Sequence, residues 1–120
     1  MTPLGQAREH VKELLAGIGV NVYENAPEVV TPPAVIIHPA STWIESATLQ
    51  VTRVNLELEA VAQPAGKNQS ALERLEELVW KIQKVFPYIG NVDAPITTKY
   101  GQSDLLSATV PVSVHVNDNE

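Results

Sequence analysis

Apolar side chains recur at helical spacing near the start of the chain. The stripe consists of Leu4, Ala7, Val11, Leu14, Leu15 and Ile18. Thr2 and Pro3 precede it as an N-cap residue followed by a proline at the first helical position. Gly17 and Gly19 follow it and can take left-handed conformations after the last turn. The pattern therefore predicts a helix over about residues 3–17.

A second helical pattern follows the linker 63–69, QPAGKNQ. Ser70 and Glu73 stand at the spacing of a capping box and are predicted to begin this helix, whereas Pro87 and Gly90 are predicted to end it. Its predicted buried stripe consists of Leu72, Leu75, Leu78, Val79, Ile82 and Phe86.

Shorter apolar runs predict strands in the first half of the chain. Residues 20–23 read as a short strand, and residues 34–38 as an apolar strand with prolines on both sides. A strand this apolar is expected to be covered on both faces, with the next long strand as one neighbour. The segment 39–47, PASTWIESA, reads as a loop.

Residues 48–62 predict a long strand in which the apolar positions change parity. The apolar residues before Thr52-Arg53 share one parity, whereas those from Val54 onward take the other and would point to the opposite face. Two explanations stay open: a bulge near Thr52-Arg53, or a first part that leaves the sheet and packs elsewhere.

The last part of the chain reads as a hairpin of two strands, 96–100 and 105–116, around GQSD. The second of these alternates without a break, and Pro111 on its polar parity predicts an edge position or a bulge. The order of elements predicts an α+β fold with two helices packed on one face of a mainly antiparallel, roughly four-stranded sheet. The 120 residues fit a single domain, 1–120.

Composition narrows the class of protein. The net charge is −6 and the pI is near 5.0, which argues against stable binding to nucleic acid or to an anionic membrane. The absence of cysteine excludes a disulfide framework and thiolate metal sites. The sequence also has no apolar run long enough for a membrane span and no signal-peptide pattern at its start, so a soluble cytosolic protein is expected.

Candidate chemistry is sparse. His10, His38 and His115 lie in different predicted elements without ligand spacing, and the sequence has no phosphate-binding loop and no nucleophile elbow. Glu57 and Glu59 share one strand face, as a general acid–base pair would, but the solvated face of a strand produces the same pattern and is favoured. We therefore expect a protein that is not an enzyme, without catalytic, cofactor-binding or metal-binding residues.

The placement of the tryptophans is unusual. On a helical wheel Trp80 falls opposite the predicted stripe, and Trp43 lies beside Ile44 in a predicted loop. Tryptophan is enriched at interface hot spots, so these three residues are predicted to contact another subunit or a partner. Two alternatives stay open: the rings lie over charged side chains, or the loop around Trp43 covers Trp80.

The stretch GVNVYENAPEVVTPPAVIIHPASTWIE, followed by a long alternating strand and a helix that opens after QS, resembles the tail terminator proteins of long-tailed bacteriophages. The resemblance covers nearly the whole chain in the order of its elements. Its most specific part is the pattern P-x-x-x-x-P-P-A-V-x-x-x-P over residues 27–39. That family has no catalytic motif whose residues can be carried over to this sequence.

The resemblance implies a homo-oligomeric ring, expected to contain six copies, that caps the tail tube, stops its polymerisation and presents a surface for head joining. Its implied partners are its own copies, the major tail tube protein and neck proteins. Its implied location is the virion tail at the head–tail interface, after assembly in the host cytoplasm. In such a ring the polar strand face with Asn55, Glu57 and Glu59 is expected to be solvated and to line the lumen.

Two other functions stay open at this point. One is another neck or head-closure connector, and the other is a small α+β ligand-binding domain or enzyme with its site between subunits. The sequence does not decide the oligomer number, the host, the ring face that meets the head, or whether the chain is monomeric before assembly.

Overall fold

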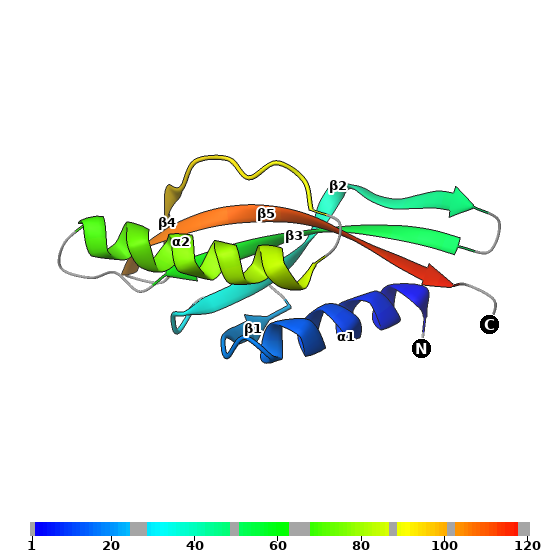
Figure 1. Ribbon diagram of the computed structural model, residues 1–120, viewed down its shortest axis with the longest axis horizontal. Coiled ribbons are helices and arrows are strands. Elements are labelled where there is room, and N and C mark those ends of the chain that lie inside the picture. Colours follow the sequence, from blue (N-terminus) through cyan, green and yellow to red (C-terminus); the bar gives the residue numbers. More distant parts are fainter. Residues whose placement is uncertain are drawn as a thin grey trace.

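The computed structural model describes residues 2–24, 29–48, 51–62, 68–86, 89–100 and 103–117. Their order is α1 (Pro3–Ala16), β1 (Asn21–Tyr23), β2 (Ala34–Thr48), β3 (Val51–Ala62), α2 (Asn68–Val85), β4 (Ile96–Tyr100) and β5 (Ser103–Asn117). In this part of the chain the strands form a sheet in the order β1-β2-β3-β5-β4. The molecule is elongated, with extents of 50 × 26 × 25 Å, and both helices lie over one face of the sheet (Figure 1).

The α+β prediction is confirmed, but the described part of the sheet has five strands and not four. The fifth is the three-residue strand β1, which pairs in parallel with the first residues of β2, while the other pairings are antiparallel. The short strand predicted over residues 20–23 is therefore confirmed, although the expected count of roughly four strands did not include it. Pairing with the buried start of β2 is what makes this segment extended.

The first helix has the predicted cap. The side-chain oxygen of Thr2 accepts a hydrogen bond of 3.1 Å from the backbone N–H of Gly5, and Pro3 occupies the first turn. Gly17 follows the last turn in a right-handed conformation, and Gly19 takes the left-handed one with φ of 76°. The predicted helix over residues 3–17 is therefore confirmed, and the left-handed position falls to Gly19 alone.

The second helix begins earlier than predicted. It starts at Asn68, so Ser70 lies inside the first turn and the predicted capping box with Glu73 is wrong. Leu72 is 39% exposed, which contradicts its place in the predicted stripe. The buried positions are Ala71, Leu75, Leu78, Ile82 and Phe86. Ala71 and Leu72 lie on either side of Leu75 around the helix, and the smaller residue takes the buried position while the larger one lies on the exposed flank.

The strand β2 continues through the segment predicted as a loop, so the loop prediction for residues 39–47 is wrong. Its register with β3 is interrupted between Pro39 and Ile44, where residues 40–43 lie opposite Asn55 alone. A second interruption, between Ser46 and Thr48, leaves one residue of β2 unmatched. The strand keeps pairing on both sides of a large bulge, and for this reason a sequence without regular alternation remains extended.

The predicted bulge near Thr52-Arg53 is also wrong. The register of β3 with β5 is continuous from Val51 to Ala62, and the irregularities lie in β2. Val51 is paired and half-buried, so the alternative that this part leaves the sheet fails for it as well. Leu49, the other residue of the shifted parity, lies outside the described residues.

The apolar start of β2 is covered on both faces, as predicted. Val35 and Ile37 belong to the main core under the two helices. Ala34 and Ile36 belong to a second cluster on the opposite face. The buried members of this second core are Val30, Ala34, Ile36, Val61 and Leu105, and the rings of Tyr23 and Tyr100 pack against them. The prolines therefore flank a strand that two cores share.

Pro111 lies in β5, which is flanked by β3 and β4 and is not an edge strand in the described sheet. The pairing with β4 ends at Ser107, and at Pro111 the adjacent segment is Ile89–Gly90, whose Gly90 N–H donates a 2.8 Å hydrogen bond to the Pro111 carbonyl oxygen. The backbone of Pro111 thus faces away from β3. The missing N–H consequently removes no hydrogen bond from the ladder with β3.

Candidate interaction surfaces

Trp80 is the large aromatic residue that α2 leaves outside its own core. Its side chain is 60% exposed, and the ammonium of Lys84, one turn later, lies 5.4 Å from the ring centroid. This position on the outer side of α2 confirms the helical-wheel prediction, and the contact with Lys84 matches the expected alternative of a ring against a charged side chain. More than half of the residue's surface is nevertheless left to solvent, which is a large exposed area for one aromatic residue.

Beside Trp80 the surface is hollowed into an apolar groove of about 220 Å³. One wall is the flank of α2, with Leu72, Val79 and Trp80, and the other is the segment before β4, with Val92 and Pro95. In Figure 1 this segment is the yellow trace that arches past α2 toward β4. Leu72, displaced from the core, thereby becomes part of a surface, which we call the α2 groove.

The rim of the α2 groove carries acidic groups. Glu76 on α2 and Asp93 on the opposite wall both belong to its lining and are exposed. The groove therefore combines an apolar floor with a negative edge.

Trp43 and Ile44 lie next to each other where β2 resumes pairing after its bulge. Their side chains are 43% and 47% exposed. The side-chain amide of Asn55 donates a 2.8 Å hydrogen bond to the backbone oxygen of Thr42 and so holds the bulge against β3. Trp43 is not among the described residues that line the α2 groove beside Trp80. The alternative that the loop around Trp43 covers Trp80 is therefore wrong for the described residues. We call Trp43 and Ile44 the β2 knob.

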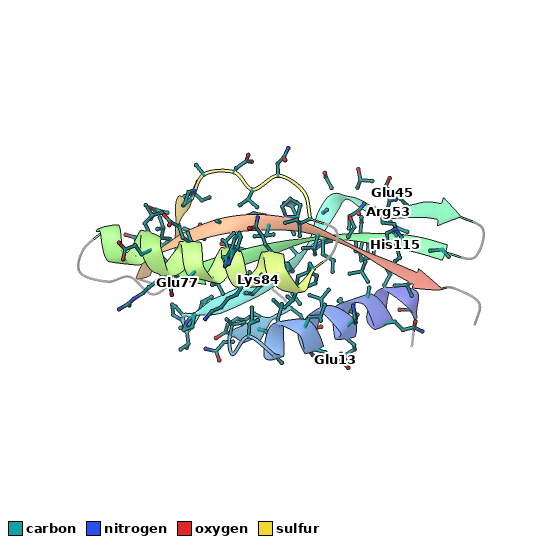
Figure 2. All side chains as sticks on the ribbon, in the orientation of Figure 1. Glu13, Glu45, Arg53, Glu77, Lys84 and His115 are labelled. Atoms are coloured by element: carbon teal, nitrogen blue, oxygen red, sulfur yellow. The ribbon has the colours of Figure 1, made fainter. Side chains whose placement is uncertain are left out.

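Glu45, the residue after the β2 knob, is paired across the sheet with Arg53, which is paired in turn with His115. Arg53 lies 3.9 Å from a carboxylate oxygen of Glu45 and donates a 3.4 Å hydrogen bond from Nε to Nε2 of His115. Asn55 donates a 2.6 Å hydrogen bond to the same carboxylate oxygen of Glu45. Figure 2 shows Glu45, Arg53 and His115 together at the end of the sheet that extends beyond α2, away from Glu77 and Lys84.

The helix-free face of the sheet carries the predicted polar residues, but they are not uniformly solvated. Asn55 is half-buried and accepts a 2.7 Å hydrogen bond from the hydroxyl of Ser113, and Glu57 is also partly exposed. The side chain of Glu59 is only 12% exposed, which contradicts the expectation of a solvated residue. The cause is Tyr100, whose ring packs on the second core beside it.

Glu59 is the centre of a small hydrogen-bonded cluster. One of its carboxylate oxygens accepts a 2.5 Å hydrogen bond from the Tyr100 hydroxyl and lies 3.0 Å from Nε2 of His38. Burial, the hydrogen bond to Glu59 and the charge of Glu59 raise the pKa of Tyr100 well above its ordinary value. The phenol therefore stays protonated at neutral pH and acts as a hydrogen-bond donor.

Within the described ranges no three His, Asp or Glu side chains are grouped as metal ligands. Neither α1 nor α2, the helices of the described part, is long and apolar enough to cross a membrane.

The chain matches no protein-family model and no curated protein. Of the residues singled out in the sequence, the structure places Trp43 with Ile44 on one surface and Trp80 on another. It adds two features that periodicity did not reveal: the second wall of the α2 groove, and the link from Glu59 to His38 and Tyr100. Tyr23 and Tyr100, aromatic residues in otherwise polar segments, were the available signal for the second core.

Proposed function

We propose that this chain is a tail terminator protein of a long-tailed bacteriophage. It forms a ring of six copies on the last ring of the tail tube, stops further polymerisation and presents a surface to which the head joins. Its partners are its own copies, the major tail tube protein and neck proteins. It acts in the virion at the head–tail interface, after assembly in the host cytoplasm, and is neither an enzyme nor a cofactor-binding protein.

The observation that carries this proposal is the exposed Trp80 beside the apolar α2 groove. Large apolar side chains next to a hollow, with a polar rim around them, are typical of surfaces that another protein covers. The resemblance of residues 27–39 to tail terminators supports the identity of the assembly. The order of elements, a helix followed by two long paired strands and a second helix, is compatible with it.

The helix-free polar face is proposed to line the lumen of the ring. It carries Glu57 and the half-buried Asn55, and the chain as a whole has a net charge of −6. A negative wall repels passing DNA over the screening length of about 8–10 Å and so does not retain it. Arg53, at one end of this face, reduces the negative charge there. Glu59 contributes through its hydrogen bonds and not as a solvated charge.

The two alternative functions require different features of the structure. A neck or head-closure connector would use the same surfaces with a different partner. A ligand-binding domain or enzyme with a site between subunits would need reactive groups, and the cluster of His38, Glu59 and Tyr100 is the observation that favours it. We rank this alternative lower because the carboxylate of Glu59 is only 12% exposed and is already engaged by Tyr100 and His38.

Negative-stain images of the purified chain mixed with purified tail tubes test the proposal. We expect a six-fold ring with a central pore at one end of each tube, and tubes that no longer elongate when more tube protein is added. A Trp80→Ala variant should leave the tube ends uncapped. Tubes that elongate normally with the wild-type chain bound nowhere would overturn the proposal, and binding to head connectors alone would favour the neck protein.

A further inference from the structure

We propose that the β2 knob, Trp43 and Ile44, of one copy binds in the α2 groove of the next copy. The inference deepens the ring assembly proposed above and rests on it for the biological role. The contact itself is deduced from the two surfaces alone.

The size and lining of the α2 groove suit a large aromatic side chain. Its volume is about 220 Å³, and its walls include Leu72, Val79, Val92 and Pro95. An apolar cavity of about 150 Å³ in another protein is large enough to bind benzene. The groove therefore has room for the larger indole ring of a tryptophan, with its apolar walls removed from water in the process.

The β2 knob is the apolar protrusion that the same chain offers. Trp43 and Ile44 are neighbours in sequence and both are more than two-fifths exposed. The hydrogen bond from Asn55 to the Thr42 backbone fixes the bulge from which they project. A bulge whose backbone is held in place loses little backbone entropy on binding, which favours an aromatic residue there as a hot spot.

The groove and the knob belong to different ends of one elongated molecule. Ile44 is followed by Glu45, which Figure 2 places with Arg53 and His115 at the end of the sheet away from α2. The groove is formed by α2 and the segment before β4. In a molecule 50 Å long, a knob at this end fills a groove on α2 when it comes from a second copy.

Charge supports a second copy as the occupant. The rim of the groove carries the carboxylates of Glu76 and Asp93. Arg53 lies beside the knob, paired across the sheet with Glu45, whose carboxylate offsets part of its charge. An acidic rim around the groove and a guanidinium beside the knob orient the two surfaces toward each other and raise the rate of encounter.

A contact between two different patches of identical chains is heterologous. Such contacts close into rings when the rotation between neighbours allows it and otherwise continue into filaments. Each copy then uses one knob and one groove, and this makes a specific prediction for mixtures of variants.

Two variants test the contact by sedimentation. Trp43→Ala removes the anchor of the knob, and Leu72→Glu places a charge on the wall of the groove at a side chain that is already 39% exposed. Each variant alone should remain monomeric, while their equimolar mixture should form dimers and nothing larger, because one intact knob meets one intact groove. A mixture that stays monomeric while the wild type assembles, or variants that each assemble like the wild type, would overturn the proposal.

A cross-linking experiment detects the contact even when it is weak in the free protein. The chain has no cysteine, so Ile44→Cys combined with Val92→Cys introduces one thiol at the knob and one at the groove. A short bifunctional thiol reagent should link them between chains at concentrations up to about 1 mM, where a contact of millimolar Kd is half formed. The control pairs Val92→Cys with His10→Cys, at an exposed position of α1. Equal linking in both pairs, or none in either, contradicts the contact.

Failure of this contact and failure of the proposed function are separable. If the knob and groove cross-link between chains but tail tubes remain uncapped, the contact stands and the tail terminator proposal falls. If Leu72→Glu abolishes tube capping but no cross-link forms, the groove binds the tube protein and the inference of a second copy is wrong. Thermal unfolding of each variant confirms that it is folded before either result is read.

Discussion

The hydroxyl of Tyr100 donates a 2.5 Å hydrogen bond to the carboxylate of Glu59. The two residues belong to β4 and β3, which are not adjacent, because β5 lies between them in the sheet. The tyrosine side chain therefore crosses β5 on the helix-free face. His38 of β2 reaches the same carboxylate oxygen from the other side at 3.0 Å. One buried oxygen thus connects three strands, beside the second core.

We expect Tyr100→Phe to lower the free energy of unfolding by about 1–3 kcal/mol, because a largely buried carboxylate loses a donor. Urea denaturation at neutral pH measures the change. Tyr23→Phe is the matched control, since Tyr23 packs against the same core and its oxygen accepts a hydrogen bond of 3.1 Å from an exposed backbone N–H of Thr31. If Tyr23→Phe lowers the free energy of unfolding as much as Tyr100→Phe does, the hydrogen bond to Glu59 does not account for the loss.

The same pair predicts a dependence of stability on alkaline pH. The pKa of Tyr100 is raised in the folded state, first by burial and then by Glu59, above the value of about 10 of an unfolded tyrosine. The unfolded chain therefore loses this proton first, and the stabilisation that is complete below about pH 10 declines as the pH rises further. Denaturation at several pH values should show a steeper decline above about pH 10 in the wild type than in Tyr100→Phe. Parallel curves would contradict the link.

Trp80→Ala should change the free energy of unfolding by no more than about 1 kcal/mol, because the ring is exposed and its contact with Lys84 is a surface cation–π interaction. Assembly or tube capping should nevertheless be lost. Leu75→Ala, on the buried side of the same helix, is the comparison and should cost about 2–5 kcal/mol. If Trp80→Ala unfolds the monomer as readily as Leu75→Ala does, Trp80 contributes to the core and not to an interface.

Asn55→Ala should loosen the bulge of β2. The side chain bonds the Thr42 backbone, Glu45 and Ser113, and it is the single residue of β3 opposite residues 40–43. We expect a loss of about 1–3 kcal/mol and faster hydrogen exchange in the bulge. Ser113→Ala, which removes one of these bonds and keeps the one to Thr42, should leave exchange in the bulge nearly unchanged. Similar exchange in both variants would show that another contact holds the bulge.

The two glycines after α1 should respond to alanine in opposite directions. Gly19 has φ of 76°, so Gly19→Ala is expected to cost about 1–2 kcal/mol, although an added methyl group would meet no atom within 4 Å. Gly17 has φ of −66°, and its added methyl group would make ordinary contact at 3.4 Å, so Gly17→Ala should stabilise by about 0.4–1 kcal/mol. Thermal unfolding of both variants gives the comparison. A loss of stability in both variants would indicate strain at Gly17 that its φ angle does not reveal.

The sequence by itself determined the features that depend on near neighbours along the chain. The Thr2 cap, the body of both helices, the alternation of the last strand and the outward position of Trp80 each follow from residues no more than about a turn or two apart. Hydrogen bonding and side-chain direction repeat within such a distance, so composition and spacing are sufficient to predict them.

Only the tertiary structure decided the features that depend on register between distant segments. Residues 40–43 of β2 form a bulge opposite Asn55 alone, and Leu72 is exposed whereas its neighbour Ala71 is buried. Glu59 alternates like a solvated residue but is covered by Tyr100, 41 positions away along the chain. Helical and strand periodicity relate only residues a few positions apart, so neither can predict a contact across 41 positions. The order of strands in the sheet decides which segment lies beside a strand and covers its face. This order depends on the whole fold.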